Sequence, residues 1–174
     1  VEVLVAIVVL SFGLLGMVGM QAFSLQSNRE ARLQGQAAVL ARELAEMMRG
    51  NKQVAVLTTT ATNPYLGTYA VGSLTPSTAS YCLSVGSSCS STTDVASAQM
   101  TDWLARVDAT LPGACISVCL DGAPYDNNGL PQWNCTPSTA NEIIFIKIGW
   151  TQSSTDRSKT GTASFNQASD TNSR

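Results

Sequence analysis

The sequence predicts an α+β protein in which a long N-terminal helix packs against a small antiparallel sheet and a second, shorter helix. Three observations lead to this prediction. The first 50 residues contain no proline and keep a helical pattern, a second amphipathic helix lies in the middle of the chain, and two apolar segments rich in β-branched residues follow it. We therefore divide the chain into a long helix, residues 1–50, and a head, residues 51–174, which has the length of one ordinary domain.

The beginning of the long helix is apolar on every side. Val3 to Met20 carry no charge, and Ser11 is the only polar side chain among them. At about 1.5 Å per residue, a helix of this length spans roughly the hydrocarbon layer of a membrane. Side chains that are apolar all round suit lipid or a closely packed helix bundle, so we assign residues 1–25 to such an environment.

Glu2 stands directly in front of this apolar run. A carboxylate at the edge of a membrane segment is unfavourable unless it is paired or close to water, which makes Glu2 a candidate functional residue. One hypothesis is that it neutralises a positive group, such as the amino terminus of a neighbouring helix. The alternative is an interfacial residue with no further role.

The second half of the long helix is amphipathic, because its apolar residues recur at steps of four and three and its charged residues populate the other faces. The head must cover this stripe, which consists of Leu33, Ala37, Leu40, Leu44 and Met47. Arg49 followed by Gly50 and Asn51 predicts the end of the helix with a left-handed cap.

Five cysteines and no histidine occur in the chain, and all five cysteines lie in the head. Beside a membrane segment this indicates disulfides in an oxidising compartment, whereas a zinc site is disfavoured by irregular spacing and the lack of histidine. In an extended strand, Cys115 and Cys119 would lie about 13 Å apart, too far to bridge. That geometry excludes only one pairing. Among the others we expect Cys82 with Cys89 and Cys119 with Cys135, leaving Cys115 unpaired.

The head begins with a predicted loop from Thr58 to Ser80, which Tyr65, Leu66, Tyr69 and Val71 would anchor. Thr93 or Asp94 would cap the second helix, and Leu111-Pro112-Gly113 would end it. Its apolar face comprises Met100, Trp103, Leu104, Val107 and Leu111.

Three strands are predicted after the second helix: Ala114 to Leu120, Glu142 to Thr151 and a weak one at Thr162 to Gln167. The second is apolar on both faces apart from Lys147, so we place it centrally in the sheet. The intervening loop, 121–140, is rich in Asp, Asn, Gly and Pro. It lacks the ligand spacing of a calcium loop and is interpreted as turns. Trp103, Trp133 and Trp150 are interpreted as core or loop anchors.

The residue types argue against catalysis and against nucleic-acid binding. A formal charge of −2 without a basic patch offers no electrostatic support for nucleic acid. Without histidine, Ser and Cys triads lack their usual base, and no glycine-rich phosphate loop follows a strand. We expect no catalytic residues, no cofactor, no metal and no small-molecule substrate.

The opening residues, VEVLVAIVVLSFGLLGM, resemble the N-terminal helix of type IV pilins and pseudopilins. In that family a prepilin peptidase removes a leader, and the new terminus, usually a methylated Phe, is followed by Thr, Leu, an apolar residue and Glu. Val1 and Glu2 match the last two of these positions. The resemblance implies a mature chain without its leader and first three residues.

The head resembles a narrower group, the minor pilins called type IV pilus modification protein PilV. The matching residues are Cys82, Cys89, Trp103, Leu111-Pro112-Gly113, Ser117-Val118-Cys119-Leu120-Asp121, Cys135 and Ile146-Lys147-Ile148-Gly149-Trp150. The sequence departs from that pattern at Gly149, where an aromatic residue is expected, and at Cys115, where a small residue is usual. The resemblance implies the pilin fold and agrees with the two expected disulfides.

The resemblance also implies a function in type IV pilus assembly or priming. The apolar helix would insert into the filament core through Val3, Leu4, Ile7, Leu10, Leu14 and Met17, with Glu2 setting the register. Expected partners are other major and minor pilins, the inner-membrane assembly platform and, during maturation, the prepilin peptidase. The head would be periplasmic before assembly, on a single-pass inner-membrane protein, and at the cell surface afterwards. The alternatives are a minor pseudopilin of a type II secretion system and a membrane-anchored binding domain that does not polymerise.

Overall fold

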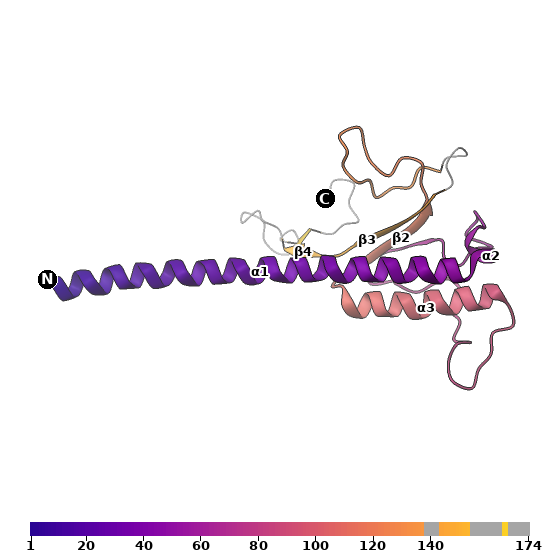
Figure 1. Ribbon diagram of the computed structural model, residues 1–174, viewed down its shortest axis with the longest axis horizontal. Helices are drawn as coiled ribbons and strands as arrows, with labels where there is room; N and C mark the ends of the chain where they lie inside the picture. Colours follow the sequence, from indigo (N-terminus) through magenta and orange to yellow (C-terminus); the bar gives the residue numbers. More distant parts are fainter. Residues whose placement is uncertain (138–142, 154–164, 167–174) are drawn as a thin grey trace. The chain divides into compact units, whose positions relative to one another are not determined.

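The computed structural model describes residues 1–137, 143–153 and 165–166 and has the predicted α+β architecture (Figure 1). The chain forms two compact units, Val1–Gln36 and Ala37–Arg174, and the boundary falls inside the first helix. The elements in chain order are α1 (Glu2–Gly50), α2 (Lys52–Ala55), β1 (Gly67–Tyr69), α3 (Thr92–Thr110), β2 (Cys115–Leu120), β3 (Ile144–Gly149), β4 (Gln152–Ser153) and β5 (Phe165–Asn166).

The C-terminal part of α1 buries one stripe in the second unit. Ala37, Leu40, Leu44 and Met48 are buried, whereas Met47, which we expected in the stripe, is only half-buried. Helix geometry explains the difference. Met48, four positions after Leu44, is rotated from it by about 40° around the helix axis, whereas Met47, three positions after, is rotated by about 60° in the other direction and lies farther from the stripe. Leu33, in the first unit, is half-buried.

The end of α1 was predicted correctly at Gly50, but the left-handed cap was not. Asn51 has φ −116°, and α2 (Lys52–Ala55) begins at the next residue. The Asn51 side chain instead donates a hydrogen bond from Nδ2 to the carbonyl oxygen of Thr92 at 2.7 Å. That bond fastens the end of α1 to the beginning of α3.

Helix α3 lies alongside the C-terminal part of α1 (Figure 1). The Trp103 indole donates from Nε1 to the carbonyl oxygen of Leu40 at 3.0 Å, and Arg106 forms an ion pair with Glu43 at 2.6 Å. All five residues of the predicted apolar face are completely buried, and the helix ends at Thr110 with Leu111 as its C-cap, in agreement with the predicted stop at Leu111-Pro112-Gly113. Its N-cap is Ser91, whose side chain accepts from the Asp94 amide, and not Thr93 or Asp94.

The main sheet of the described residues is antiparallel, with strand order β1-β2-β3. The central strand is β2, so our placement of the segment containing Lys147 at the centre was wrong. In β2, Ile116 and Val118 are almost completely buried, whereas Ile144 to Ile148 of β3 are half-buried. The strand β2 is central because β3 pairs with one of its edges and β1 pairs with the other. The strand β1 lies within the predicted Thr58–Ser80 loop, where no strand was expected.

Three of the four side chains that we expected to anchor the segment Thr58–Ser80 do so. Tyr65, Leu66 and Tyr69 are buried, whereas Val71 is exposed and does not serve as an anchor. Of the predicted final strand, the structure describes only β5, which pairs with β4 in antiparallel fashion; the remainder of Thr162–Gln167 lies outside the described residues.

Candidate functional site

The apolar beginning of α1 is not covered by any other part of the chain that the structure describes. Among the described residues, α1 is the one helix long and apolar enough to cross a membrane, with a mean hydropathy of 2.6 over its most apolar 18-residue window. The described residues bury none of that window. The six packing positions expected from the resemblance have exposed fractions between 56% and 72%: Val3, Leu4, Ile7, Leu10, Leu14 and Met17. Such an extended apolar surface requires lipid or other protein chains around it.

Polar groups within this segment are satisfied locally. Ser11 Oγ donates to the carbonyl oxygen of Ile7 at 2.7 Å, so the only hydroxyl of the apolar run needs no external partner. A Cβ atom added at Gly13, Gly16 or Gly19 would meet no atom within 4 Å. The small size of these glycines is therefore not required by any contact in the described chain.

Glu2 occupies the first turn of α1 and is exposed. A carboxylate there is favoured by the positive end of the helix dipole. Within residues 1–137, 143–153 and 165–166, no ion pair to Glu2 is present.

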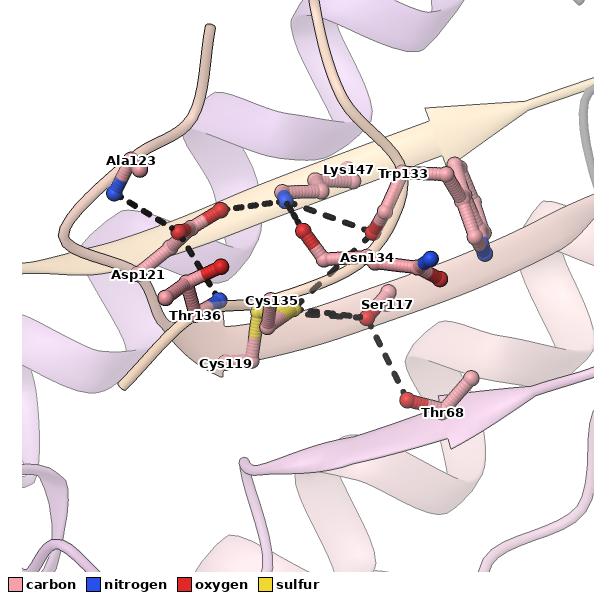
Figure 2. The surroundings of a disulfide bond; sticks show 10 residues. All are labelled: Thr68, Ser117, Cys119, Asp121, Ala123, Trp133, Asn134, Cys135, Thr136 and Lys147. Carbon is pink, nitrogen blue, oxygen red and sulfur yellow. Dashed lines mark hydrogen bonds and ion pairs between the residues drawn. A yellow bond between two sulfur atoms is a disulfide. The ribbon is translucent and has the colours of Figure 1, made fainter. Parts of the chain in front are cut away.

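The head contains a buried ion pair that the sequence did not reveal. Asp121 directly follows β2, Lys147 lies on β3, and their charged groups are in contact (Figure 2). The Asp121 side chain is completely buried and that of Lys147 is 11% exposed. Lys147 Nζ also donates to the carbonyl oxygens of Trp133 at 3.3 Å and Asn134 at 3.1 Å. All three donors of the ammonium therefore have acceptors.

The carboxylate of Asp121 also holds both ends of the loop 122–137. Its Oδ1 accepts from the amides of Ala123 at 3.0 Å and Thr136 at 3.1 Å. Burial by itself raises the pKa of Asp121, but the hydrogen bonds from Lys147, Ala123 and Thr136 and the charge of Lys147 outweigh it and leave the pKa below its ordinary value. Asp121 is thus kept ionised and fixed by its surroundings.

Two disulfides have the expected pairing. Cys82 is bonded to Cys89 and Cys119 to Cys135, with Cα–Cα distances of 4.9 and 6.4 Å. The second ties β2 to loop 122–137 beside the ion pair, and Ser117 Oγ lies 3.5 Å from Cys135 Sγ (Figure 2). Cys115 is free and buried, and burial raises the pKa of its thiol. A buried thiol with a raised pKa is a poor nucleophile.

Cys119, Cys135 and Asp121 bring two sulfurs and a carboxylate oxygen within 4.8 Å of one another. The two sulfurs are joined to each other, so neither is the thiolate that a metal ion would require. These three residues instead hold loop 122–137 in place, through the disulfide and through the hydrogen bonds of Asp121.

That loop and β3 together form a groove of about 420 Å³. Its lining is mainly apolar and aromatic: Pro124, Tyr125, Leu130, Pro131, Gln132, Trp133, Phe145, Ile146, Lys147 and Ile148. The loop wall is rigidified by hydrogen bonds from Gln132 N to Pro124 O at 2.9 Å and from the amides of Asn128 and Leu130 to Asp126 Oδ1. Trp133, expected as a core or loop anchor, is half-buried, lines the groove and accepts a hydrogen bond from Lys147 through its carbonyl oxygen.

The sequence signal for the Asp121 site was Lys147 itself, the one charged residue in an otherwise apolar strand. Burial of an unpaired ammonium group is unfavourable, so a lysine in such a strand must either pair with an anion or reach solvent. Sequence reasoning treated Asp121 as a turn residue, which is correct for its hydrogen bonds to Ala123 and Thr136 but misses the ion pair.

Comparison with known proteins adds no family assignment, because no protein-family model, curated protein or solved structure matches this chain.

Proposed function

We propose that this protein is a minor pilin that takes part in the assembly or priming of a type IV pilus. The observation that carries the proposal is the division within α1. The helix is apolar all round and uncovered in its first part, whereas from Ala37 onwards it presents a stripe that is buried in the head. A subunit with these properties can pass from a membrane, where lipid covers the helix, into a filament, where other helices do.

The arrangement of the head supports the same proposal. A long N-terminal helix combined with a small antiparallel sheet and two disulfide-linked loops agrees with the pilin fold implied by the sequence resemblance. In the proposed mechanism, apolar residues from Val3 to Leu25 pack against neighbouring helices. Glu2 compensates the amino terminus of an adjacent subunit and thereby sets the axial register. The head presents its loops to other subunits or to surfaces.

A helix replacement tests the proposal. Val3 to Met20 are replaced by an unrelated spanning helix of the same length and hydropathy, and the protein is followed in membranes and in filaments. A filament subunit should remain in the membrane and lose incorporation, because its helix packing is specific. Unimpaired function of the replaced protein would indicate a simple anchor and contradict the proposal. A pseudopilin would also fail the replacement, but the failure would appear in protein secretion and not in surface filaments.

A further inference from the structure

Three cysteines compete for a single disulfide in the second half of the head. Cys115 and Cys119 belong to β2, and Cys135 lies in loop 122–137. The disulfide joins Cys119 to Cys135 and leaves Cys115 as a buried thiol. Because the two β2 cysteines are four positions apart in one strand, their side chains point to the same face of the sheet. Folding therefore has to select one of two similar partners for Cys135.

The separation along the chain does not make this selection. Cys135 lies 16 positions after Cys119 and 20 positions after Cys115. The probability of closing a loop falls with about the 3/2 power of its length, so an unfolded chain favours the observed pair by only about 1.4-fold. The same dependence favours a short ring between Cys115 and Cys119, which β2 excludes because their Cα atoms would lie about 13 Å apart in the strand. The selection must come from folded structure.

The Asp121–Lys147 ion pair holds the residues on both sides of Cys135 (Figure 2). The carbonyl oxygen of Asn134 accepts a hydrogen bond from Lys147 Nζ at 3.1 Å, and the amide of Thr136 donates to Asp121 Oδ1 at 3.1 Å. The backbone of Cys135 is thus positioned from both sides. Neither contact involves a sulfur atom, so both can form in the reduced chain before any disulfide exists.

The position in which the ion pair holds Cys135 lies at the end of β2 that carries Cys119. The Cα atoms of these two cysteines are 6.4 Å apart, within the range of a disulfide. Ser117 Oγ lies 3.9 Å from Cys119 Sγ and 3.5 Å from Cys135 Sγ, so the same hydroxyl contacts both sulfurs. Cys115 begins β2 at the other end of the strand and is 1% exposed. In the folded head, Cys119 is the β2 cysteine beside Cys135.

We infer that the Asp121–Lys147 ion pair selects the disulfide partner of Cys135, presenting this thiol to Cys119 and keeping it away from Cys115. The bond forms when the Cys119 and Cys135 thiols together lose two electrons and two protons to a disulfide oxidant, which is reduced to two thiols. If Cys115 and Cys119 have bonded first, the Cys135 thiolate attacks Cys119 Sγ and Cys115 leaves as the thiolate, without net oxidation. The inference concerns maturation of the head and does not depend on the proposed function.

Oxidative refolding of the full-length chain in detergent tests the inference. The protein is reduced and unfolded, and then refolded in a mixture of reduced and oxidised glutathione. Free thiols are alkylated with one reagent, and the thiols released by a subsequent reduction are alkylated with a second reagent. The tryptic peptide 107–147 contains all three competing cysteines. Its fragmentation in a mass spectrometer identifies which cysteine was free.

In the wild-type protein, Cys115 should be the free thiol in nearly all molecules. In Asp121→Asn, the share of molecules with Cys115 free should fall to about half or less, because loop-closure statistics then govern the pairing. Asp121→Asn combined with Cys115→Ser should restore the bond between Cys119 and Cys135, since the competing β2 thiol is absent. That restoration is specific to a role in selecting the partner.

Trp103→Ala is the matched control, because it removes a completely buried side chain of α3 and should lower stability to a similar extent without changing the ion pair. Its free thiol should remain Cys115. Equal mispairing in Trp103→Ala and Asp121→Asn would show that lost stability alone causes it. That result, unchanged pairing in Asp121→Asn, or a failure of Cys115→Ser to restore the bond would each overturn the inference.

Discussion

Asp121 and Lys147 form a buried ion pair that connects the central strand of the head with the edge of its surface groove. Asp121 directly follows β2 and accepts amide hydrogen bonds from both ends of loop 122–137, while Lys147 on β3 donates to the carbonyl oxygens of Trp133 and Asn134. The pair therefore does more than neutralise two charges. It also sets the position of loop 122–137, which the Cys119–Cys135 disulfide links to β2, relative to the sheet.

Asp121→Asn should destabilise the head strongly. The change leaves the Lys147 ammonium buried without its anion, and removal of one partner of a buried ion pair commonly costs about 3–5 kcal/mol. The measurement is the free energy of unfolding from urea denaturation of the full chain in detergent. Asp126→Asn is the control, because an amide oxygen can still accept from Asn128 and Leu130. Equal effects of the two changes would show that the ion pair has no special weight.

The ion pair should also give the head a defined dependence on pH. Because the pKa of Asp121 is lower in the folded protein than in the unfolded chain, its contribution is complete above the ordinary carboxyl value of about 3.9. It is lost as the pH falls through the folded value. The difference in unfolding free energy between wild type and Asp121→Asn should therefore stay constant from neutral pH to about pH 5 and shrink in stronger acid. A difference that shrinks as the pH rises from 5 to 7 would contradict this assignment.

Removing the Cys119–Cys135 disulfide by a double change to serine should loosen loop 122–137. Cross-linking residues that are 16 positions apart stabilises a fold by roughly 3 kcal/mol in the chain-entropy description. Hydrogen exchange should accelerate in the loop and remain slow in α3, which the Cys119–Cys135 disulfide does not join to the loop. The matched double change at Cys82 and Cys89 should have the opposite pattern and leave loop 122–137 protected.

Trp103 should be the side chain that binds α3 to α1 most strongly. It is completely buried and donates to the Leu40 carbonyl oxygen. Trp103→Ala should destabilise the head by about 3–5 kcal/mol, because it leaves a large cavity. Trp103→Phe keeps a ring but loses the hydrogen bond, so its effect should be smaller. Thermal unfolding of both variants measures the order, and a larger effect of Phe than of Ala would contradict the packing described.

Replacing Glu2 by Ala should reduce incorporation into filaments and leave the head folded, because Glu2 lies in the first turn of α1, outside the compact unit that contains the head. Glu2→Gln separates charge from size, and loss with both variants would identify the charge as the necessary property. Incorporation is measured by immunoblot of sheared material, and folding by circular dichroism. Unchanged incorporation of both variants would remove the register role from the account.

The sequence predicted the elements that depend on local patterns. The stop signal at Arg49 and Gly50 gave the end of α1. Helical periodicity gave the buried face of α3, since Met100, Trp103, Leu104 and Val107 repeat at the helical spacing. Turn residues gave the end of α3 at Leu111-Pro112-Gly113. At Gly113 the requirement is physical, because φ is +56° and an added Cβ would lie 2.2 Å from Thr151 Oγ1.

Features that depend on long-range pairing escaped sequence analysis. The segment containing β3 is the more apolar strand, yet β2 is central, because strand order is decided by where β1 pairs and not by apolarity. The Asp121–Lys147 pair likewise arises only when β2 and β3 are aligned with Leu120 opposite Ile144. The groove requires that same alignment together with the fastening of loop 122–137.

The most direct test of the central claim is an immunoblot for this protein in filaments sheared from the cell surface, compared between cells with and without the major pilin. The account predicts that the protein co-shears when the major pilin is present and is absent from the sheared fraction when it is not. Retention in the membrane fraction in both strains, with none in the sheared filaments, would contradict a role as a filament subunit.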